Sequence, residues 1–220
     1  MKNERLNIAI DGPAGAGKST IAKELSKRLN IVYLDTGAMY RGIAYLALKN
    51  GVDVTSEIDV MPILDTLDMR IECGDIQQII VNGENVTPYI REHKISKAAS
   101  DISALPPVRM KMVELQREFA AKNDVVLDGR DIGTFVLPNA RYKFYITAMP
   151  EERAKRRLLQ LTERGEHLKY DDILTDIIKR DYNDSHRDFA PLKQADDAVF
   201  IDTTIMSIDE ALKTVLSKME

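Results

Sequence analysis

The stretch LNIAIDGPAGAGKST, residues 6–20, decides the fold class of this chain. Its first part, Leu6–Asp11, is a short apolar run typical of a buried β-strand. A glycine-rich turn follows, and beyond it Ile21, Leu25 and Leu29 recur at helical spacing. A strand, a glycine-rich loop and a helix in this order favour an α/β fold with a parallel sheet.

The glycine-rich turn itself, GPAGAGKS at residues 12–19, fits the pattern G-x-x-x-x-G-K-[S/T]. Backbone N–H groups of such a loop surround phosphate oxygens, and the next helix adds the positive end of its dipole. Lys18 would place a charge on the outer phosphates, and Ser19 would bind Mg²⁺ through its hydroxyl. An ordinary glycine-rich turn is the alternative, but the flanking strand and helix favour the binding of a nucleoside triphosphate.

Four more short β-rich runs occupy residues 31–35, 125–128, 143–147 and 198–202, and a helical pattern follows each. With the first strand they predict a doubly wound, parallel five-stranded sheet that helices cover on both faces.

Residues 67–90 interrupt this alternation with apolar runs that Gly74-Asp75 and Asn82-Gly83 separate. Because Asn and Gly both tolerate positive φ, Asn82-Gly83 favours a tight hairpin, and we expect an antiparallel insert of about three strands. Farther along, Pro106-Pro107 is expected to end one helix and begin the next.

Composition limits the classes of partner. A chain of 220 residues can bury one core, and one α/β domain with insertions is the simplest expectation. The net charge of −4 gives no field that attracts nucleic acid or an anionic membrane. The single cysteine, Cys73, forms no intrachain disulfide and is interpreted as a small core residue. Without a signal peptide or a membrane-spanning run, we expect a soluble cytoplasmic protein, and a monomer.

Charged residues follow the strand run at 125–128, where Asp128, Arg130 and Asp131 stand among glycines. Solvated charges at a strand end are one interpretation. However, ligands of doubly wound sheets bind beyond the carboxyl ends of the strands, and this position favours a functional role.

The stretch LDTGAMYR, residues 34–41, presents a similar choice after the second strand. Asp35, Thr36, Tyr40 and Arg41 could line a cleft beside the phosphate loop. Alternatively, Asp35 or Thr36 is the N-cap of a helix, and both interpretations can hold at once.

Two further charged segments lie in the C-terminal third. In EERAKRRLLQ, residues 151–160, Arg153 and Arg157 are four positions apart, so two guanidinium groups can point the same way and grip phosphoryl oxygens. A solvated amphipathic helix is the interpretation that a basic run alone favours. The segment 163–172, ERGEHLKYDD, joins two predicted helices and is our candidate for a lid.

In RDYNDSHR, residues 180–187, Arg180, Asp184 and Arg187 recur at i, i+4 and i+7. This spacing puts two arginines and a carboxylate on one helical face, either as a binding surface or as a simple row of salt bridges.

The motifs DGPAGAGKST, LDTGAMYR, LDGRDIGT and RDYNDSHR, in this order and with these separations, resemble the bacterial cytidylate kinase family of nucleoside monophosphate kinases. The expected antiparallel insert is similar to the one that marks this family. The phosphate loop alone would match many unrelated families, whereas the four motifs with the insert cover essentially the whole chain. The resemblance implies Mg²⁺-assisted transfer of a phosphoryl group from ATP directly, in line, to CMP or dCMP.

The resemblance also implies roles for individual residues. The ATP phosphates would be held by Gly12, Pro13, Ala14, Gly15, Ala16, Gly17, Lys18, Ser19 and Thr20. The acceptor nucleotide would be bound by Asp35, Thr36, Tyr40, Arg41, Ser100, Arg109, Arg130, Asp131, Asp184 and Arg187. Of these, Arg41 and Arg130 would contact its phosphate; Ser100, Arg109 and Asp131 the cytosine; Asp184 and Arg187 the sugar. The catalytic cations would be Lys18, Arg41, Arg130, Arg153, Arg157 and Arg180. Asp128 would hold Mg²⁺ through water, beside the direct ligand Ser19.

The implied organisation is a core (about 1–35, 122–152 and 188–220), an acceptor-binding region with the insert (about 36–121) and a lid (about 153–187). No general base is needed because the acceptor phosphate is already ionised, so the protein has to align the nucleotides, neutralise charge and exclude water. A kinase of the same fold acting on UMP, AMP or a small acid such as shikimate is the alternative. A P-loop switch protein is more remote because the sequence lacks a guanine-reading N-K-x-D element.

Overall fold

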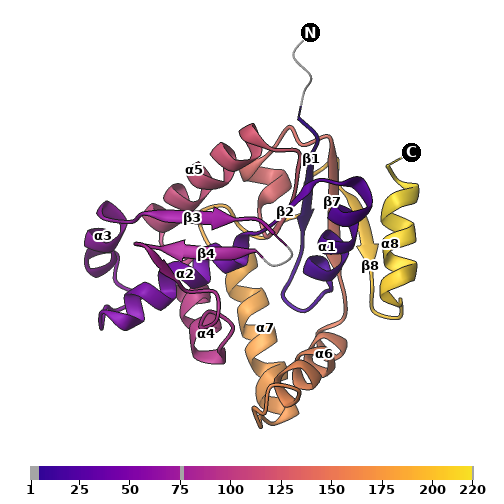
Figure 1. Cartoon of the computed structure of the whole chain (residues 1–220). Helices are drawn as coiled ribbons and strands as arrows, with labels where there is room; N and C mark the ends of the chain where they lie inside the picture. The colour runs from indigo at the N-terminus through magenta and orange to yellow at the C-terminus, as the bar shows by residue number, and fades with distance from the viewer. Residues whose placement is uncertain (1–4, 75–76, 220) are drawn as a thin grey trace. The chain divides into compact units, whose positions relative to one another are not determined.

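The computed structural model describes residues 5–74 and 77–219, and the chain divides into two compact units. The first unit consists of Val32–Asp124 with the N-terminal segment that ends at Arg5, and the second consists of Leu6–Ile31 and Val125–Glu220. Figure 1 shows the course of the chain through them.

Parallel strands form the centre of the second unit: β1 (Asn7–Asp11), β6 (Val125–Gly129), β7 (Tyr142–Thr147) and β8 (Val199–Asp202). With β2 (Val32–Asp35) the strand order of the sheet is β2-β6-β1-β7-β8. The interior of β1 is fully buried, as expected for a parallel strand with both faces covered. The predicted five-stranded parallel sheet is confirmed, with strand ends within about a residue of those expected.

The register of β1 fixes the edge at which the site forms. Ile10 lies opposite Asp128 of β6, and Asp11 lies opposite Gly129. On its other side, Asp11 lies opposite Tyr145 of β7. The carboxyl ends of these strands therefore meet at one edge of the sheet.

The helices of the second unit are α1 (Lys18–Leu29), the short π-helical turn η1 (Ile132–Val136), α6 (Pro150–Thr162), α7 (Tyr170–His186) and α8 (Ile208–Ser217). Helix α1 buries Ile21 and Leu25 and packs against β1, β6 and α8. Helices α6 and α7, at the bottom of Figure 1, pack together around Leu161, Ile173 and Ile177. No helix in the described part of the chain is both long and apolar enough to cross a membrane.

The first unit contains β2, α2 (Thr36–Lys49), α3 (Glu57–Asp65), β3 (Met69–Glu72), β4 (Gln78–Val81), β5 (Glu84–Asn85), α4 (His93–Ile102) and α5 (Pro106–Lys122). Strands β3, β4 and β5 form the predicted antiparallel insert. Asn82 (φ 49°) and Gly83 (φ 81°) both have positive φ at the hairpin, as predicted. Asp75 of the expected Gly-Asp break lies outside the described residues.

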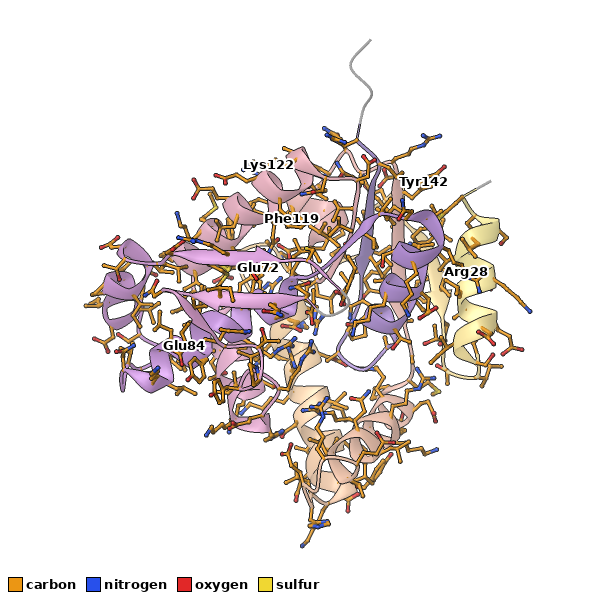
Figure 2. All side chains as sticks on the ribbon, viewed as in Figure 1. Arg28, Glu72, Glu84, Phe119, Lys122 and Tyr142 are labelled. Atoms are coloured by element: carbon orange, nitrogen blue, oxygen red, sulfur yellow. The ribbon has the colours of Figure 1, made fainter. Side chains whose placement is uncertain are left out.

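The insert packs against helix α2. Gly42 of α2 leaves no room for a larger side chain, because an added Cβ would lie 3.1 Å from Ile79 Cγ2. Glu84, labelled in Figure 2, accepts hydrogen bonds from the Tyr45 hydroxyl (3.0 Å) and from Lys49 Nζ (2.7 Å). Helix α5 begins at Pro106, as the sequence predicted.

The expectation that Cys73 is a core residue is wrong: its side chain is exposed. Strand β3 ends at Glu72, so Cys73 falls in the connection that leads toward β4 and not in the strand itself. Residue type suggested burial, but the position just beyond a strand decides exposure here.

Candidate functional site

The loop between β1 and α1 has the backbone of a phosphate-binding loop. Gly12 has φ 139°, and a Cβ there would lie 1.9 Å from the Ile146 carbonyl oxygen, so only glycine fits. Gly15 and Gly17 also have positive φ. No side chain caps α1 at Gly17, and its first turn has no acidic residue. The positive end of the helix is therefore suited to an anion.

Lys18 begins α1 and is buried, with Nζ donating to the Pro13 carbonyl oxygen at 2.7 Å. Burial, with the charges of Arg130 and Arg180 nearby, lowers the pKa of Lys18 to about 7. Asp128 and Asp11 act in the opposite direction and offset part of this shift. A bound polyanion would stabilise the charged form of Lys18 and raise its pKa.

Ser19 and Asp128 meet across the sheet edge, where Ser19 Oγ donates to Asp128 Oδ2 at 2.7 Å. Asp128 is buried at the end of β6, and Ser19 is exposed on the first turn of α1. A hydroxyl and a carboxylate are oxygen donors of the kind that Mg²⁺ prefers, so this pair fits that ion chemically.

Asp184 of α7 is a buried carboxylate that three arginines surround. Arg130 Nε donates to Asp184 Oδ2 at 2.8 Å, while Arg180 Nε and Arg187 Nη1 lie 3.9 Å from its carboxylate. Burial alone would raise the pKa of Asp184, but Arg130 and Arg180 hold it below its ordinary value. Asp184 therefore joins α7 to the loop that follows β6.

One detail of the predicted helical face is wrong. Helix α7 ends at His186, so Arg187 is not on the helix with Arg180 and Asp184; its backbone is extended (φ −68°, ψ 144°). The chain reverses here, because Leu192 N–H donates to the Asp184 carbonyl oxygen at 2.7 Å. Arg187 still reaches back, with Nη2 3.7 Å from Asp131 Oδ1 and Nε donating to the Ala190 carbonyl oxygen.

Arg153 of α6 is buried and connects the two helices of the C-terminal part to the phosphate loop. Its guanidinium group forms a bidentate ion pair with Asp181 of α7. It also donates from Nη1 to the Ala14 carbonyl oxygen (3.2 Å) and from Nε to that of Ala148 (2.8 Å). The interpretation as a wholly solvated basic helix is therefore wrong for Arg153. Arg157 is half-buried on the same helix.

In the first unit, Asp35 organises the start of α2. Its Oδ1 accepts from Ala38 N–H at 2.9 Å, which confirms the predicted N-cap. Its Oδ2 accepts from Arg41 Nη2 at 2.9 Å and lies 3.3 Å from Arg91 Nη2. Gln77 Oε1 accepts from Asp35 N–H. Asp35 therefore caps α2 and also gathers two arginines around its carboxylate.

The remaining predicted residues of this unit lie on α2, α4 and α5. Thr36 is buried at the first position of α2. The Arg109 guanidinium carbon lies 5.5 Å from the Tyr40 ring centroid, and Arg109 Nη1 donates to the Ser103 carbonyl oxygen. Ser100 is half-buried on α4. The structure therefore brings Arg109 to Tyr40 through the packing of α5 and α2.

The sequence analysis did not identify four residues that take part in these clusters: Asp11, Gln77, Arg91 and Asp181. Asp11 accepts from the N–H groups of Ile132 and Gly133, both at 2.7 Å, and burial raises its pKa to about 7. A signal did exist for Asp11, because it ends β1, much as Asp128 lies one residue before the end of β6. Asp181 lies one turn before Asp184 on α7, whereas nothing local in the sequence marks Gln77 or Arg91.

Comparison with known proteins agrees with the motifs. The family model described as "Cytidylate kinase" matches residues 8–220. The chain belongs to the cytidylate kinase family. Cytidylate kinases of Caldicellulosiruptor bescii and Lactobacillus johnsonii are each 48% identical to it; the matches cover 97% and 98% of this chain and 95% and 96% of the relatives. A solved structure of an uncharacterized protein from Eubacterium ventriosum has a TM-score of 0.52 at 14% identity, covering 98% of both chains, which is a likeness of fold alone. As a member of this family the chain is a nucleoside monophosphate kinase, a phosphotransferase.

The lowered pKa of Lys18 predicts that ATP binding takes up a proton. At pH 8 a lysine with a pKa of about 7 is mostly neutral, and the phosphates should restore its charge. Isothermal titration with ATP in buffers of different ionisation enthalpy should show proton uptake at pH 8 and much less at pH 6.

The matched control is Lys18→Met, which keeps the length of the side chain and removes the titrating group. This variant should lose the proton uptake and phosphoryl transfer, and it should remain folded in a thermal melt, since a buried charge is removed. Equal proton uptake in the variant would contradict this assignment.

Proposed function

We propose that this protein transfers the γ-phosphoryl group of ATP directly, in line, to the phosphate of CMP and dCMP. The observation that carries the proposal is the gathering of Lys18, Arg130 and Arg180 beside a glycine-rich loop, in a chain of the cytidylate kinase family. Such a cluster of cations is suited to phosphate groups, whose charge it would neutralise as the phosphoryl group moves.

On the donor side, the loop Gly12–Thr20 would hold the ATP phosphates with its backbone N–H groups, and Lys18 would exchange its bond to Pro13 for a phosphate oxygen. Ser19 would hold Mg²⁺ directly and Asp128 through water; their 2.7 Å contact supports this pairing. The ion would neutralise phosphate charge.

On the acceptor side, we propose roles for the residues that the family motifs mark. Arg41 and Arg130 would bind the acceptor phosphate, and Asp35 would hold Arg41 in place through their 2.9 Å ion pair. Asp131 would read the base, together with Ser100 and Arg109. The remaining acceptor contacts would come from Thr36, Tyr40, Asp184 and Arg187.

The phosphoryl group in transit would be stabilised by Arg153, Arg157 and Arg180, within a lid of about residues 153–187. The core would comprise about 1–35, 122–152 and 188–220, and the acceptor-binding region about 36–121. Arg153 is paired with Asp181 in this structure, so its contact with a phosphoryl group would require exchange of that ion pair. Closure of the lid would exclude water, which otherwise competes as the acceptor.

The chemistry needs alignment more than proton transfer. The acceptor phosphate is ionised near neutral pH, so in-line attack requires the two nucleotides to be held in place and charge to be neutralised. We further propose that the enzyme acts in the cytoplasm and as a monomer. Neither nucleic acid nor a membrane is proposed as a partner, because a net charge of −4 gives no field that attracts them.

The function is tested by assaying ADP formation from ATP with a panel of acceptors. CMP and dCMP should be the most efficient substrates, UMP and AMP poorer, and shikimate inactive. Uracil lacks the exocyclic amine that a base-reading carboxylate accepts from, adenine is a larger base than cytosine, and shikimate has no base. Higher efficiency with UMP, AMP or shikimate than with CMP would overturn the proposed acceptor.

Arg130 and Asp131 should have separable effects on the acceptor. An ionised aspartate only accepts hydrogen bonds, so it suits the exocyclic amine of cytosine and not the carbonyl of uracil. Asp131→Asn should lower the CMP-to-UMP ratio of kcat/KM by about tenfold or more, because a mismatched buried polar contact costs about 1–3 kcal/mol. Arg130→Ala should slow both acceptors alike, since both carry the same phosphate. If Asp131→Asn slows CMP and UMP in equal proportion, the base-reading role is wrong.

A further inference from the structure

We propose that Asp11 is a positioning residue for acceptor specificity: it caps the turn η1 from the neighbouring strand, so that Asp131 does not have to cap it. The inference rests on the proposed function, because it gives Asp131 the task of reading the base. It adds Asp11, a residue of the donor-side strand, to the machinery that distinguishes acceptors.

The first observation is the double hydrogen bond of the Asp11 carboxylate. Asp11 is 3% exposed at the end of β1, and its two oxygens accept separately from Ile132 N–H and Gly133 N–H, each at 2.7 Å. Hydrogen bonds from backbone amides to a carboxylate are short and stronger than those between neutral groups. Because Asp11 lies opposite Gly129 in the sheet register, its side chain is placed to meet the segment that follows β6.

The second observation is that Asp131, the residue at the N-cap position of η1, does not cap this turn with its side chain. Asp131 occupies the N-cap position of η1, where aspartate usually accepts from the second or third amide of the turn. Its side chain makes no such capping bond here. The amide of Gly133, the second residue of η1, is bonded to Asp11 instead. Asp131 Oδ1 lies 3.7 Å from Arg187 Nη2.

The third observation is that the carboxylate of Asp11 lies close to the backbone of Gly133. A Cβ added at Gly133 would lie 3.3 Å from Asp11 Oδ2 and 3.2 Å from Lys143 Cδ. Glycine at this position therefore lets the carboxylate approach the backbone. Asp11 also directly precedes Gly12, so the same residue stands at the junction of β1 and the phosphate loop.

The test is Asp11→Asn, which keeps the shape of the side chain but replaces one accepting oxygen by an NH₂ group that cannot accept from an amide. One amide of η1 is then left without its acceptor. We expect the Asp131 side chain to rotate and accept a hydrogen bond from that amide, as an ordinary N-cap does. The CMP-to-UMP ratio of kcat/KM should then fall about tenfold, while the dissociation constant for ATP stays within about twofold.

A double-mutant cycle separates positioning from general damage. If Asp11 acts through Asp131, Asp11→Asn should not lower the ratio further in an Asp131→Asn background. The matched control is Thr203→Val, another buried polar residue near the sheet edge, whose Oγ1 donates to the Ala16 carbonyl oxygen of the phosphate loop. This control should leave the ratio unchanged.

These experiments distinguish failure of the inference about Asp11 from failure of the proposed function. A wild-type protein that does not prefer CMP would overturn the proposed function itself. A wild-type protein that prefers CMP, with an unchanged ratio in Asp11→Asn or additive losses in the cycle, would overturn this inference alone. Should Asp11→Asn fail to fold, Gly133→Ala crowds the same carboxylate while keeping its charge, and it should lower the ratio in the same direction.

Discussion

The parallel pairing of β1 with β6 is the constraint on which the site in the second unit depends. It places Asp128 opposite Ile10 and Asp11 opposite Gly129, so two strand-end carboxylates lie at one edge of the sheet. The chain leaves β1 through the phosphate loop and leaves β6 through Arg130 and Asp131. The phosphate loop and the pair Arg130 and Asp131, which we propose for the donor and the acceptor, therefore follow neighbouring strands of one sheet.

Carboxylates balance the charge of buried cations in the second unit. In this structure the arginines are matched by carboxylates, as in the pairs Arg130–Asp184 and Arg153–Asp181. Burying a charged group is costly unless it is paired and hydrogen-bonded. Lys18 is buried beside other cations, and its pKa falls to about 7. A phosphate group placed near Lys18 would favour its charged form.

Local patterns predicted the elements of this fold well, because strand and helix periodicity, proline breaks and the Asn82-Gly83 turn act over a few residues. The same patterns failed where contacts between distant segments determine the conformation. The i, i+4, i+7 spacing could not show that α7 stops before Arg187, where the chain reverses. Partners far apart in sequence, such as Asp11 with Gly133, depend on strand register, which no single segment encodes. The motif residues of the second unit form linked clusters, but their roles toward nucleotides remain predictions.

We propose that the segment after β6 divides recognition of one nucleotide between the guanidinium group of Arg130 and the carboxylate of Asp131. A crystal structure of the protein with CMP bound tests it most directly. The account predicts that the Arg130 guanidinium contacts the phosphate, and that an Asp131 oxygen lies within hydrogen-bond distance of the exocyclic amine of cytosine while Asp11 still holds the amides of η1. A complex in which Asp131 caps η1 and other groups contact the cytosine amine would contradict it.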